Sequence, residues 1–318
     1  MKKEMQLFAG RFILSAAMAS SLLGIGLAQD DEKLTTALST DKPPVIDGKL
    51  DDACWANAEE TGGFLIFPPD FDPAPVKTTF KTVYDKDNIY FAIWCEEPEP
   101  GAMVRKERKH DDFFAGDSIE IYLDPGKTTT SYYQLIASLE GPFYDAKGVD
   151  TRWDCDWKAK GLMGDKCWTL EVQIPLASMG SAAVIKEGDM WGLNLCRNRH
   201  DYIAKASAWA PVGNNFHSPG SFGALLFGSY KGWYEKTFLA RLEAHKKLIA
   251  ESSAKLAGNP KLAQAAETVN AKAEELQKKV ASDPNALKDK KAFSKVLSEA
   301  QRIMAACDEL KTAVEASK

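Results

Sequence analysis

The segment TTFKTVY at residues 78–84 alternates polar and apolar side chains, and IYFAIW at residues 89–94 is rich in β-branched and aromatic residues. Between them, DKDN at residues 85–88 is typical of a turn. Successive side chains of a strand point to opposite faces of a sheet, so the first pattern predicts a half-buried strand. The three segments together predict a β-hairpin and indicate an all-β fold.

Further short runs of the same texture follow the hairpin. They lie at residues 118–123, 132–138, 168–174, 191–196 and 206–210. Short strands at such spacing, separated by turn signals, are typical of a sandwich or barrel. Helix-length apolar periodicity is nearly absent before residue 230. We therefore predict an all-β sandwich of antiparallel strands that ends near residue 229.

From residue 230 the composition shifts to Ala, Lys, Glu and Leu, which predicts a helical domain over residues 230–318. A first helix is expected from about Trp233 to Leu256. Asn259-Pro260 and Asp283-Pro284 each combine a capping side chain with a proline that a first helical turn tolerates, and they predict two more helix starts.

Apolar residues recur at spacings of three and four along the second and third of these helices. The stripe comprises Leu262, Ala266, Val269, Ala273, Leu276 and Val280, then Phe293, Val296, Ala300, Ile303, Cys307, Leu310 and Val314. It predicts a three-helix bundle or a long hairpin, or self-association of the chain through the stripe.

The first 28 residues have the pattern of a secretory signal peptide. Lys2, Lys3 and Arg11 give a positive start, residues 12–27 are apolar and small, and cleavage is expected before Gln29. A membrane anchor is the alternative, but the apolar run is short and contains Ser and Gly. We expect an exported protein, periplasmic or extracellular, with a linker at residues 29–40 and no stable membrane span in the mature chain.

Composition limits the remaining classes. The 318 residues suggest about two domains, with 45% hydrophobic residues, 27% charged residues and a net charge of −5, which argues against nucleic acid as a partner. The six cysteines form no CxxC pair, so a zinc site of that kind is not expected. Export permits disulfides, and Cys155 and Cys167 could face each other across a hairpin tip at residues 160–165; six free thiols remain the alternative.

Loop aromatics are the stronger functional signal. Rings beside Asp, Asn and Gly suit sugars, because the apolar face of a pyranose stacks on them while polar neighbours take the hydroxyls. The same rings could instead cap the ends of the sandwich. They are Phe64, Phe67, Phe71, Phe113, Phe114, Trp153, Trp157 and Phe216.

Five motifs in order resemble carbohydrate-binding module family 9 over residues 41–228. They are VIDGKLDDACW at 45–55, VYDKDNIY at 83–90, GDSIEIYLD at 116–124, WTLEVQIP at 168–175 and SPGSFG at 218–223. The resemblance implies a β-sandwich at residues 41–229 and non-catalytic binding of a polysaccharide or oligosaccharide, with a role in carbohydrate catabolism as one expectation. The helical residues 230–318 lie outside it.

The resemblance also implies site residues. Two family tryptophans that sandwich a terminal sugar fall on Phe114 and Phe216. Polar contacts are implied for Glu120, Asp117 and either Asn214 or Asn215. The family has a basic residue where Ile136 stands and a glutamine where Cys196 stands, so these two positions argue against the same ligand, a reducing-end glucan or xylan sugar.

Three other functions are alternatives to carbohydrate binding. One is an interaction scaffold that uses the helical tail, and another is a haem-binding electron carrier with His200 and Met190 as conceivable ligands. A glycoside hydrolase needs two paired carboxylates, but Asp117 and Glu120 are separated by an odd number and should lie on opposite faces. Calcium is a further candidate because acidic loops are plentiful, although no ligand set of characteristic spacing is visible.

Overall fold

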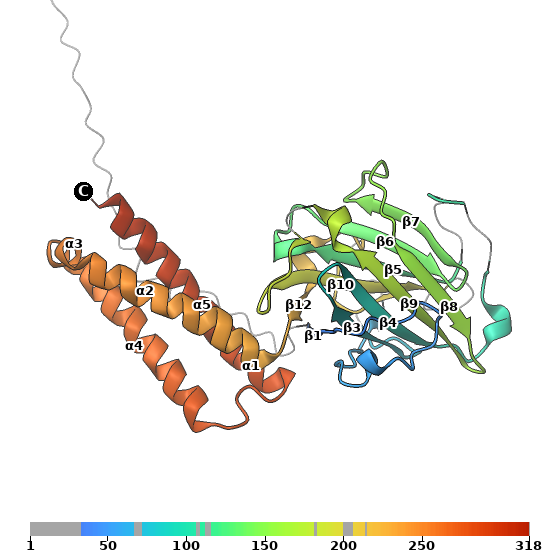
Figure 1. Cartoon of the computed structure of the whole chain (residues 1–318), viewed down its shortest axis with the longest axis horizontal. Helices are drawn as coiled ribbons and strands as arrows, with labels where there is room; N and C mark the ends of the chain where they lie inside the picture. The colour runs from blue at the N-terminus through green and yellow to red at the C-terminus, as the bar shows by residue number, and fades with distance from the viewer. Residues whose placement is uncertain are drawn as a thin grey trace, which may run out of the picture. The chain divides into compact units, whose positions relative to one another are not determined.

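The structure is a computed structural model that describes residues 33–66, 72–105, 109–111, 116–180, 183–199, 206–213 and 215–317. A large β-sheet is followed by helices, which confirms the predicted sandwich with a helical C-terminal segment (Figure 1). Its strands are β1 Leu34–Ser39, β2 Leu65–Ile66, β3 Thr78–Tyr84, β4 Asn88–Glu96, β5 Ser118–Asp124, β6 Tyr133–Ser138, β7 Gly141–Lys147, β8 Lys158–Met163, β9 Cys167–Pro175, β10 Met190–Asn198, β11 Ala206–Ala208 and β12 Gly223–Phe227.

The strands follow the order β7-β6-β5-β10-β12-β1-β3-β4-β9-β8, with β11 beside β10 and β2 beside β11. The two ends of this order come close together. A Cβ added to Gly161 of β8 would lie 2.6 Å from the carbonyl oxygen of Leu139, which follows β6. The sheet is therefore a nearly closed barrel or sandwich that encloses its main core.

The β1 strand differs from the linker predicted at residues 29–40. It lies in the middle of the sheet and pairs in parallel with both β12 and β3. Its sequence, LTTALS, is rich in Thr and looks polar, but Thr35 and Thr36 are buried with Leu34 and Ala37. The antiparallel prediction therefore holds for the other ladders but not for those of β1.

The predicted core tryptophans lie largely where the sequence placed them. Trp168 and Trp191 are buried in the main core, whereas Trp94 is half-buried. Phe80 joins that core and meets Trp209 edge to face, with ring centroids 5.4 Å apart. Burial of such large rings stabilises the sandwich because apolar surface is removed from water.

The helices of the tail are α1 Tyr230–Trp233, a π-helical turn at Tyr234–Phe238, α2 Leu239–Glu251, α3 Ser253–Ala257, α4 Pro260–Ser282 and α5 Lys290–Ala316. Asn259 caps α4 as predicted, since its Oδ1 accepts from the Leu262 amide at 3.3 Å. The third predicted start is displaced. Asp289 caps α5 through the Ala292 amide at 3.0 Å, whereas the Asp283 side chain accepts from the Asn285 amide in a turn.

The apolar stripe is covered within the chain itself. Its α4 and α5 members are buried except Val280, which is partly buried against the same cluster. One cluster joins Trp233 and Phe293 of the tail to Leu34 and Leu226 of the sheet. The stripe is therefore buried inside the chain, as the predicted bundle requires, and self-association through the stripe was the alternative to that bundle.

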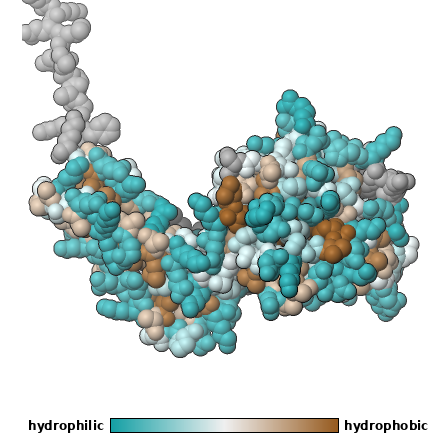
Figure 2. Space-filling view, viewed as in Figure 1, coloured by the Kyte–Doolittle hydropathy of each residue, from teal (hydrophilic) through white to brown (hydrophobic). Residues whose placement is uncertain are grey.

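The visible face of the described residues is mainly hydrophilic (Figure 2). Their large exposed apolar side chains are scattered: Val45, Val149, Leu162 and Val184. Among the helices that the structure describes, none has the length and apolar character needed to cross a membrane. The predicted signal peptide at residues 1–28 lies outside the described part.

Candidate functional site

One face of β5, β6 and β10 carries the candidate site. On β5, Glu120 is paired directly with Ile136 of β6 and with Cys196 of β10. These three positions share one face because cross-strand partners project to the same side of a sheet. The two positions at which the chain departs from the family pattern thus flank the family acid.

The Glu120 carboxylate is fully buried and accepts three hydrogen bonds. Tyr122 Oη and Gln134 Nε2 donate to Oε2 at 2.6 and 2.7 Å, and Asn198 Nδ2 donates to Oε1 at 2.7 Å. A buried carboxylate is tolerated when its oxygens are bonded in this way. The network fixes the rotamers of four polar side chains from three neighbouring strands.

An aromatic rim borders this network. Tyr132 Oη and His217 Nδ1 are 2.8 Å apart, and both residues are half-buried. Phe216 is also half-buried, with its ring centroid 6.5 Å from that of Tyr122, and Phe222 lies beneath as a buried member of the same cluster. Burial lowers the pKa of His217, although the Glu120 charge opposes this effect.

The predicted site residues separate into four groups. Phe216 and Glu120 meet in the aromatic and polar cluster just described. Asn215 is exposed, and its carbonyl oxygen accepts from Ser218 Oγ at 3.1 Å. Phe114 and Asn214 lie outside the described residues, so their placement stays a prediction.

Asp117 belongs to a different cluster. Its Oδ2 accepts from the Val104 amide at 2.9 Å, and burial raises the pKa of its carboxyl group. Both Glu97 and Arg197 influence this pKa, which places Asp117 near the charged core rather than beside Glu120. The prediction that Asp117 and Glu120 face opposite sides agrees with these contacts, and Asp117 is not part of the Glu120 network.

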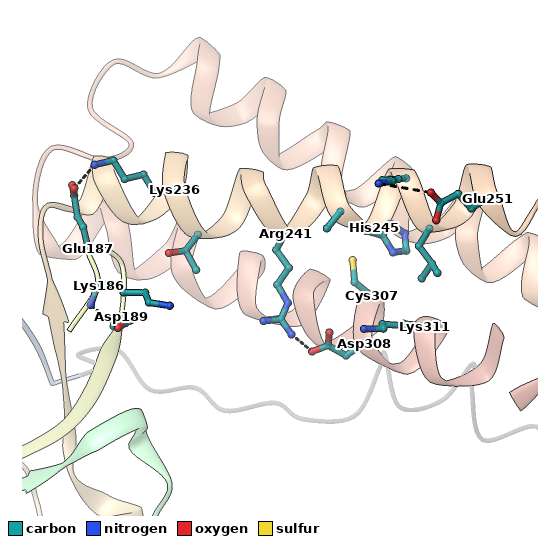
Figure 3. Close-up of a pocket in the computed structure, with 14 residues that line it drawn as sticks. Lys186, Glu187, Asp189, Lys236, Arg241, His245, Glu251, Cys307, Asp308 and Lys311 are labelled. Atoms are coloured by element: carbon teal, nitrogen blue, oxygen red, sulfur yellow. Dashed lines mark hydrogen bonds and ion pairs between the residues drawn. The ribbon is translucent and has the colours of Figure 1, made fainter. Parts of the chain in front are cut away.

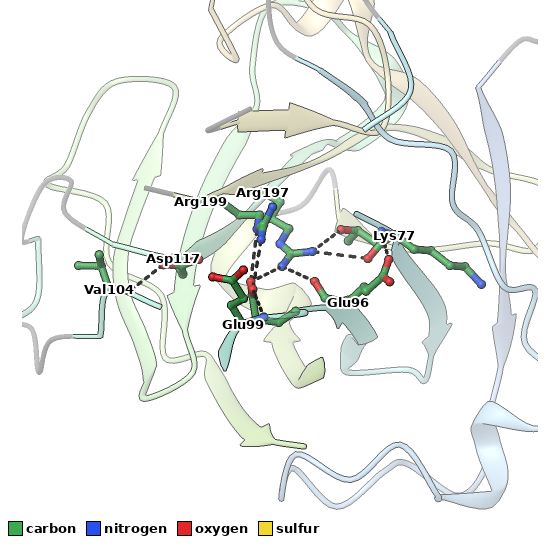
Figure 4. A network of polar contacts seen from close by, with 9 residues as sticks. Lys77, Glu96, Glu99, Val104, Asp117, Arg197 and Arg199 are labelled. Carbon is green, nitrogen blue, oxygen red and sulfur yellow. Dashed lines mark hydrogen bonds and ion pairs between the residues drawn. The ribbon is translucent and has the colours of Figure 1, made fainter. Parts of the chain in front are cut away.

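The charged core consists of Glu97, Arg197 and Arg199, and Figure 4 labels its two arginines. Arg197 Nη2 lies 3.2 Å from Glu97 Oε2 and Arg199 Nη2 lies 3.1 Å from Glu97 Oε1, with all three side chains at most 4% exposed. Arg197 also donates to Thr78 Oγ1 at 3.1 Å and to the Glu96 carbonyl at 2.8 Å. These contacts join β3, β4 and β10 at one end of the sandwich.

Sequence reasoning did not find Gln134, Asn198, Tyr132 or His217. Gln134 stands two residues before Ile136 and Asn198 two residues after Cys196, so each projects to the same face as its predicted neighbour. Because alternate residues of a strand share one face, the sequence could have indicated Gln134 and Asn198 as alternative polar contacts. The Tyr132–His217 pair could not be found in this way, because the two residues are 85 positions apart.

The cysteines are free thiols in the structure. The predicted hairpin tip at residues 160–165 is displaced: β8 continues to Met163, which pairs with Trp168, so the turn lies at residues 164–166, while Lys158 pairs with Gln173. Cys155 therefore lies toward the opposite end of the hairpin from Cys167, and the two cannot bridge the tip.

The side chains of the described residues bear on the expected haem and calcium sites. Met190 of β10 packs against the apolar cluster shared by the sheet and tail, and His200 lies outside the described residues. Within the described ranges, His110, Asp145 and Asp154 each offer one potential ligand atom, and these atoms lie within 4.8 Å of one another. Calcium takes six to eight oxygen ligands, so a set with an imidazole nitrogen does not suit it.

A concave region away from this face lies where the tail approaches the loop before β10 (Figure 3). Its volume is about 680 Å³, and its described lining residues include no Trp, Tyr or Phe. Arg241 pairs with Asp308 and Lys236 with Glu187 along its wall. His245 is only 4% exposed, and neither of its ring nitrogens has a hydrogen-bond partner in the part of the chain that the structure describes. Without aromatic faces the groove is poorly suited to sugar stacking.

The β-sandwich and its polar, aromatic face define a class of carbohydrate-binding-module-like domains. The chain matches the family model described as carbohydrate family 9 binding domain-like over residues 46–228, more than half of its length. It therefore belongs to this family, which confirms the resemblance found in the sequence motifs. No curated protein matches the sequence.

Three solved structures are similar to this chain. A family 9 carbohydrate-binding module from Caldicellulosiruptor kristjanssonii, in complex with cellotriose, has 16% identity and a TM-score of 0.46, with 61% of this chain and 93% of that chain covered. Its complex with glucose has the same identity and TM-score, with 95% of that chain covered. A protein from Bacteroides uniformis described as carbohydrate-binding has 14% identity and a TM-score of 0.47, with 61% and 98% covered.

Proposed function

We propose that the protein binds a carbohydrate, without making or breaking bonds, at the face that carries Glu120 and Phe216. The observation that carries this proposal is the buried Glu120 network beside a half-buried aromatic rim. Sugars need both kinds of surface, because pyranose C–H groups pack on rings while hydroxyls need fixed donors and acceptors. Membership of the carbohydrate family 9 binding domain-like family supports the ligand class.

Gln134 adds a specific acceptor to this face. Its Nε2 donates to Glu120 and to Tyr122 Oη, at 2.7 and 2.8 Å. Its Oε1 is buried and has no hydrogen-bond partner among the described residues. An unpaired buried acceptor costs free energy, and a hydroxyl that enters beside the rim would satisfy it. A sugar hydroxyl has this chemistry.

The polar groups of the face suit binding better than hydrolysis. A glycosidase needs two carboxyl groups within about 5 to 9.5 Å of each other across the scissile bond. Asp117 is directed toward the Glu97 cluster, and both Glu120 oxygens already accept hydrogen bonds. The pair singled out from the sequence is therefore divided between the two sides of the sheet.

The apolar Ile136 and Cys196 shape the expected ligand. They are 3% and 0% exposed and flank Glu120, so they offer no polar contact where the family pattern has basic and amide side chains. We infer a glycan recognised by ring stacking and a small number of hydroxyl contacts. An exported protein would meet such a polysaccharide or oligosaccharide outside the cytoplasm, and a role in carbohydrate catabolism fits this setting.

Calorimetry with a panel of oligosaccharides tests the function. Phe216→Ala should weaken binding of the active glycan about tenfold, since an aromatic contact contributes roughly 0.5–1.5 kcal/mol beyond buried area. Phe216→Leu is the matched control for apolar volume, and it should bind almost as weakly as Phe216→Ala. Phe216→Trp should bind more tightly than the native chain because it offers a larger stacking surface. Absence of heat for every glycan, or equal affinity of all four proteins, would reject this site.

A further inference from the structure

Three side chains from separate segments meet on the other side of β7 from the candidate sugar face. His110 precedes β5, Asp145 lies within β7, and Asp154 lies in the connection from β7 to β8. One potential ligand atom from each residue lies within 4.8 Å of the others. His110 Nε2 is 3.1 Å from Asp154 Oδ1.

Asp145 is the residue that most requires a partner. It is 0% exposed, and its Oδ2 accepts from the Trp157 indole at 3.1 Å. Its Oδ1 is buried and makes no hydrogen bond of ordinary geometry among the described residues, although the Cys155 amide lies near enough to the carboxyl group to oppose the rise in its pKa that burial causes. A buried carboxylate oxygen without a partner is costly, and a bound cation would remove that cost.

The local backbone holds His110 against β7. The Asp111 amide donates to the Phe143 carbonyl at 2.7 Å, and Asp111 has a φ of 63°, a left-handed conformation that non-glycine residues adopt infrequently. Asp111 Oδ1 is 3.6 Å from His110 Nε2, so a third carboxylate borders the cluster.

We propose that His110, Asp145 and Asp154 bind a divalent transition-metal ion, with zinc as the representative ion. One imidazole nitrogen and two carboxylate oxygens are a donor set that zinc accepts, at metal–ligand distances of about 2.0–2.2 Å. Ligands at such distances lie roughly 3.4 Å apart in a tetrahedral site. The side chains of His110 and Asp154 are 54% and 75% exposed, so they are free to rotate toward the buried Asp145.

The three ligands would connect the segment at residues 109–111 to β7 and to the β7–β8 connection. The metal therefore acts as a structural clamp that is separate from carbohydrate recognition. Nothing in this proposal depends on a sugar ligand, since Glu120 projects from β5 on the opposite face. Zinc binding and carbohydrate binding can therefore be tested independently on the same protein.

Zinc binding is measured by calorimetry and by elemental analysis after dialysis of the chelator-treated full chain. We expect one zinc ion per chain for the native protein. Asp145→Asn keeps the shape of the side chain and an acceptor for Trp157, and it should weaken zinc binding at least tenfold. His110→Gln should do the same at an exposed residue, so it carries the test if Asp145→Asn fails to fold. Asp165→Asn, an exposed aspartate at the β8–β9 turn, is the matched control and should bind zinc normally.

Cobalt separates this site from the six free thiols. Nitrogen and oxygen ligands give visible cobalt bands without the near-ultraviolet sulfur-to-metal band of thiolates. The proposal is overturned if the native chain takes up no more zinc than His110→Gln. A cobalt spectrum dominated by the thiolate band also overturns it, as does tighter binding of calcium than of zinc.

Discussion

Asn198 Nδ2 donates to Glu120 Oε1 at 2.7 Å and thereby connects the end of β10 to the middle of β5. Gln134 of β6 reaches the other carboxylate oxygen at the same distance. The buried acid is thus held from both neighbouring strands. These hydrogen bonds hold the buried polar side chains of the candidate binding face in place beneath the partly exposed aromatic rim.

Replacement of Glu120 by Gln should affect both stability and binding. The amide would present a donor group to side chains that already donate, so at least one charge-assisted hydrogen bond is lost. We expect the free energy of unfolding to fall by about 2–3 kcal/mol and sugar affinity to fall at least tenfold. Urea denaturation and calorimetry measure the two effects. Glu60→Gln, at an exposed ion pair with Lys77, is the control and should change stability by less than about 1 kcal/mol.

The Glu97 cluster should act on stability alone. Glu97→Gln would leave Arg197 and Arg199 buried without their carboxylate, and loss of one partner of a buried ion pair costs about 3–5 kcal/mol. Glu140→Gln breaks the more exposed pair with Arg105 and should cost no more than about 1 kcal/mol. Chemical denaturation gives both values. A folded Glu97→Gln protein with native stability but weakened sugar binding would show that the cluster serves the binding site instead.

His245 should make the protein sensitive to acid. Burial lowers the pKa of this imidazole in the folded chain, whereas in the unfolded chain it titrates near its ordinary value of about 6.5. As the pH falls through that value, the unfolded state takes up a proton that the folded state does not, so stability decreases. At higher pH both states are neutral and the penalty is absent.

The variant His245→Leu should reduce this loss of stability between about pH 7 and pH 5. Thermal unfolding across that range measures it. His217 also has a lowered pKa, so some dependence should remain in His245→Leu and decrease further in the double variant with His217→Gln. Identical pH profiles of the native chain and His245→Leu would mean that the imidazole is solvated in solution.

Removal of the tail after Gly228 should destabilise the sandwich. Leu34 and Leu226 would lose the cover of Trp233 and Phe293, and each exposed leucine costs about 1.5–3 kcal/mol. We expect a lower urea midpoint and an increased tendency to aggregate, measured by denaturation and light scattering. Unchanged stability of the shortened chain would mean that the tail does not dock on the sheet.

Local sequence patterns were sufficient to predict the elements that depend on contacts between residues close in the sequence. The alternating segment at residues 78–84 and the run at 89–94 become β3 and β4 with the expected turn, and the periodic stripe of α4 and α5 is buried. Strand parity correctly separated Asp117 from Glu120. These features follow from side-chain periods of two and of three to four residues.

The pairing of segments that are far apart in the sequence could not be predicted from such local patterns. The β1 segment has no strong alternation, and it is a strand because β12 and β3 flank it. The partners of Glu120 depend on the register of three strands, which the sequence motifs do not state. The start of α5 was misplaced because two Asp residues, Asp283 and Asp289, compete as caps and only the packed helix selects between them.

The pairing of Leu34 with Ala224 has a kinetic consequence. A strand near the beginning of the chain completes the sheet only after β12, near the end of the sandwich, has been synthesised. Contacts of such long sequence separation form slowly, because the loop between them must close first. The nascent chain therefore lacks its central ladder until β12 has been synthesised, and the strands made before β12 remain an incomplete sheet until that point.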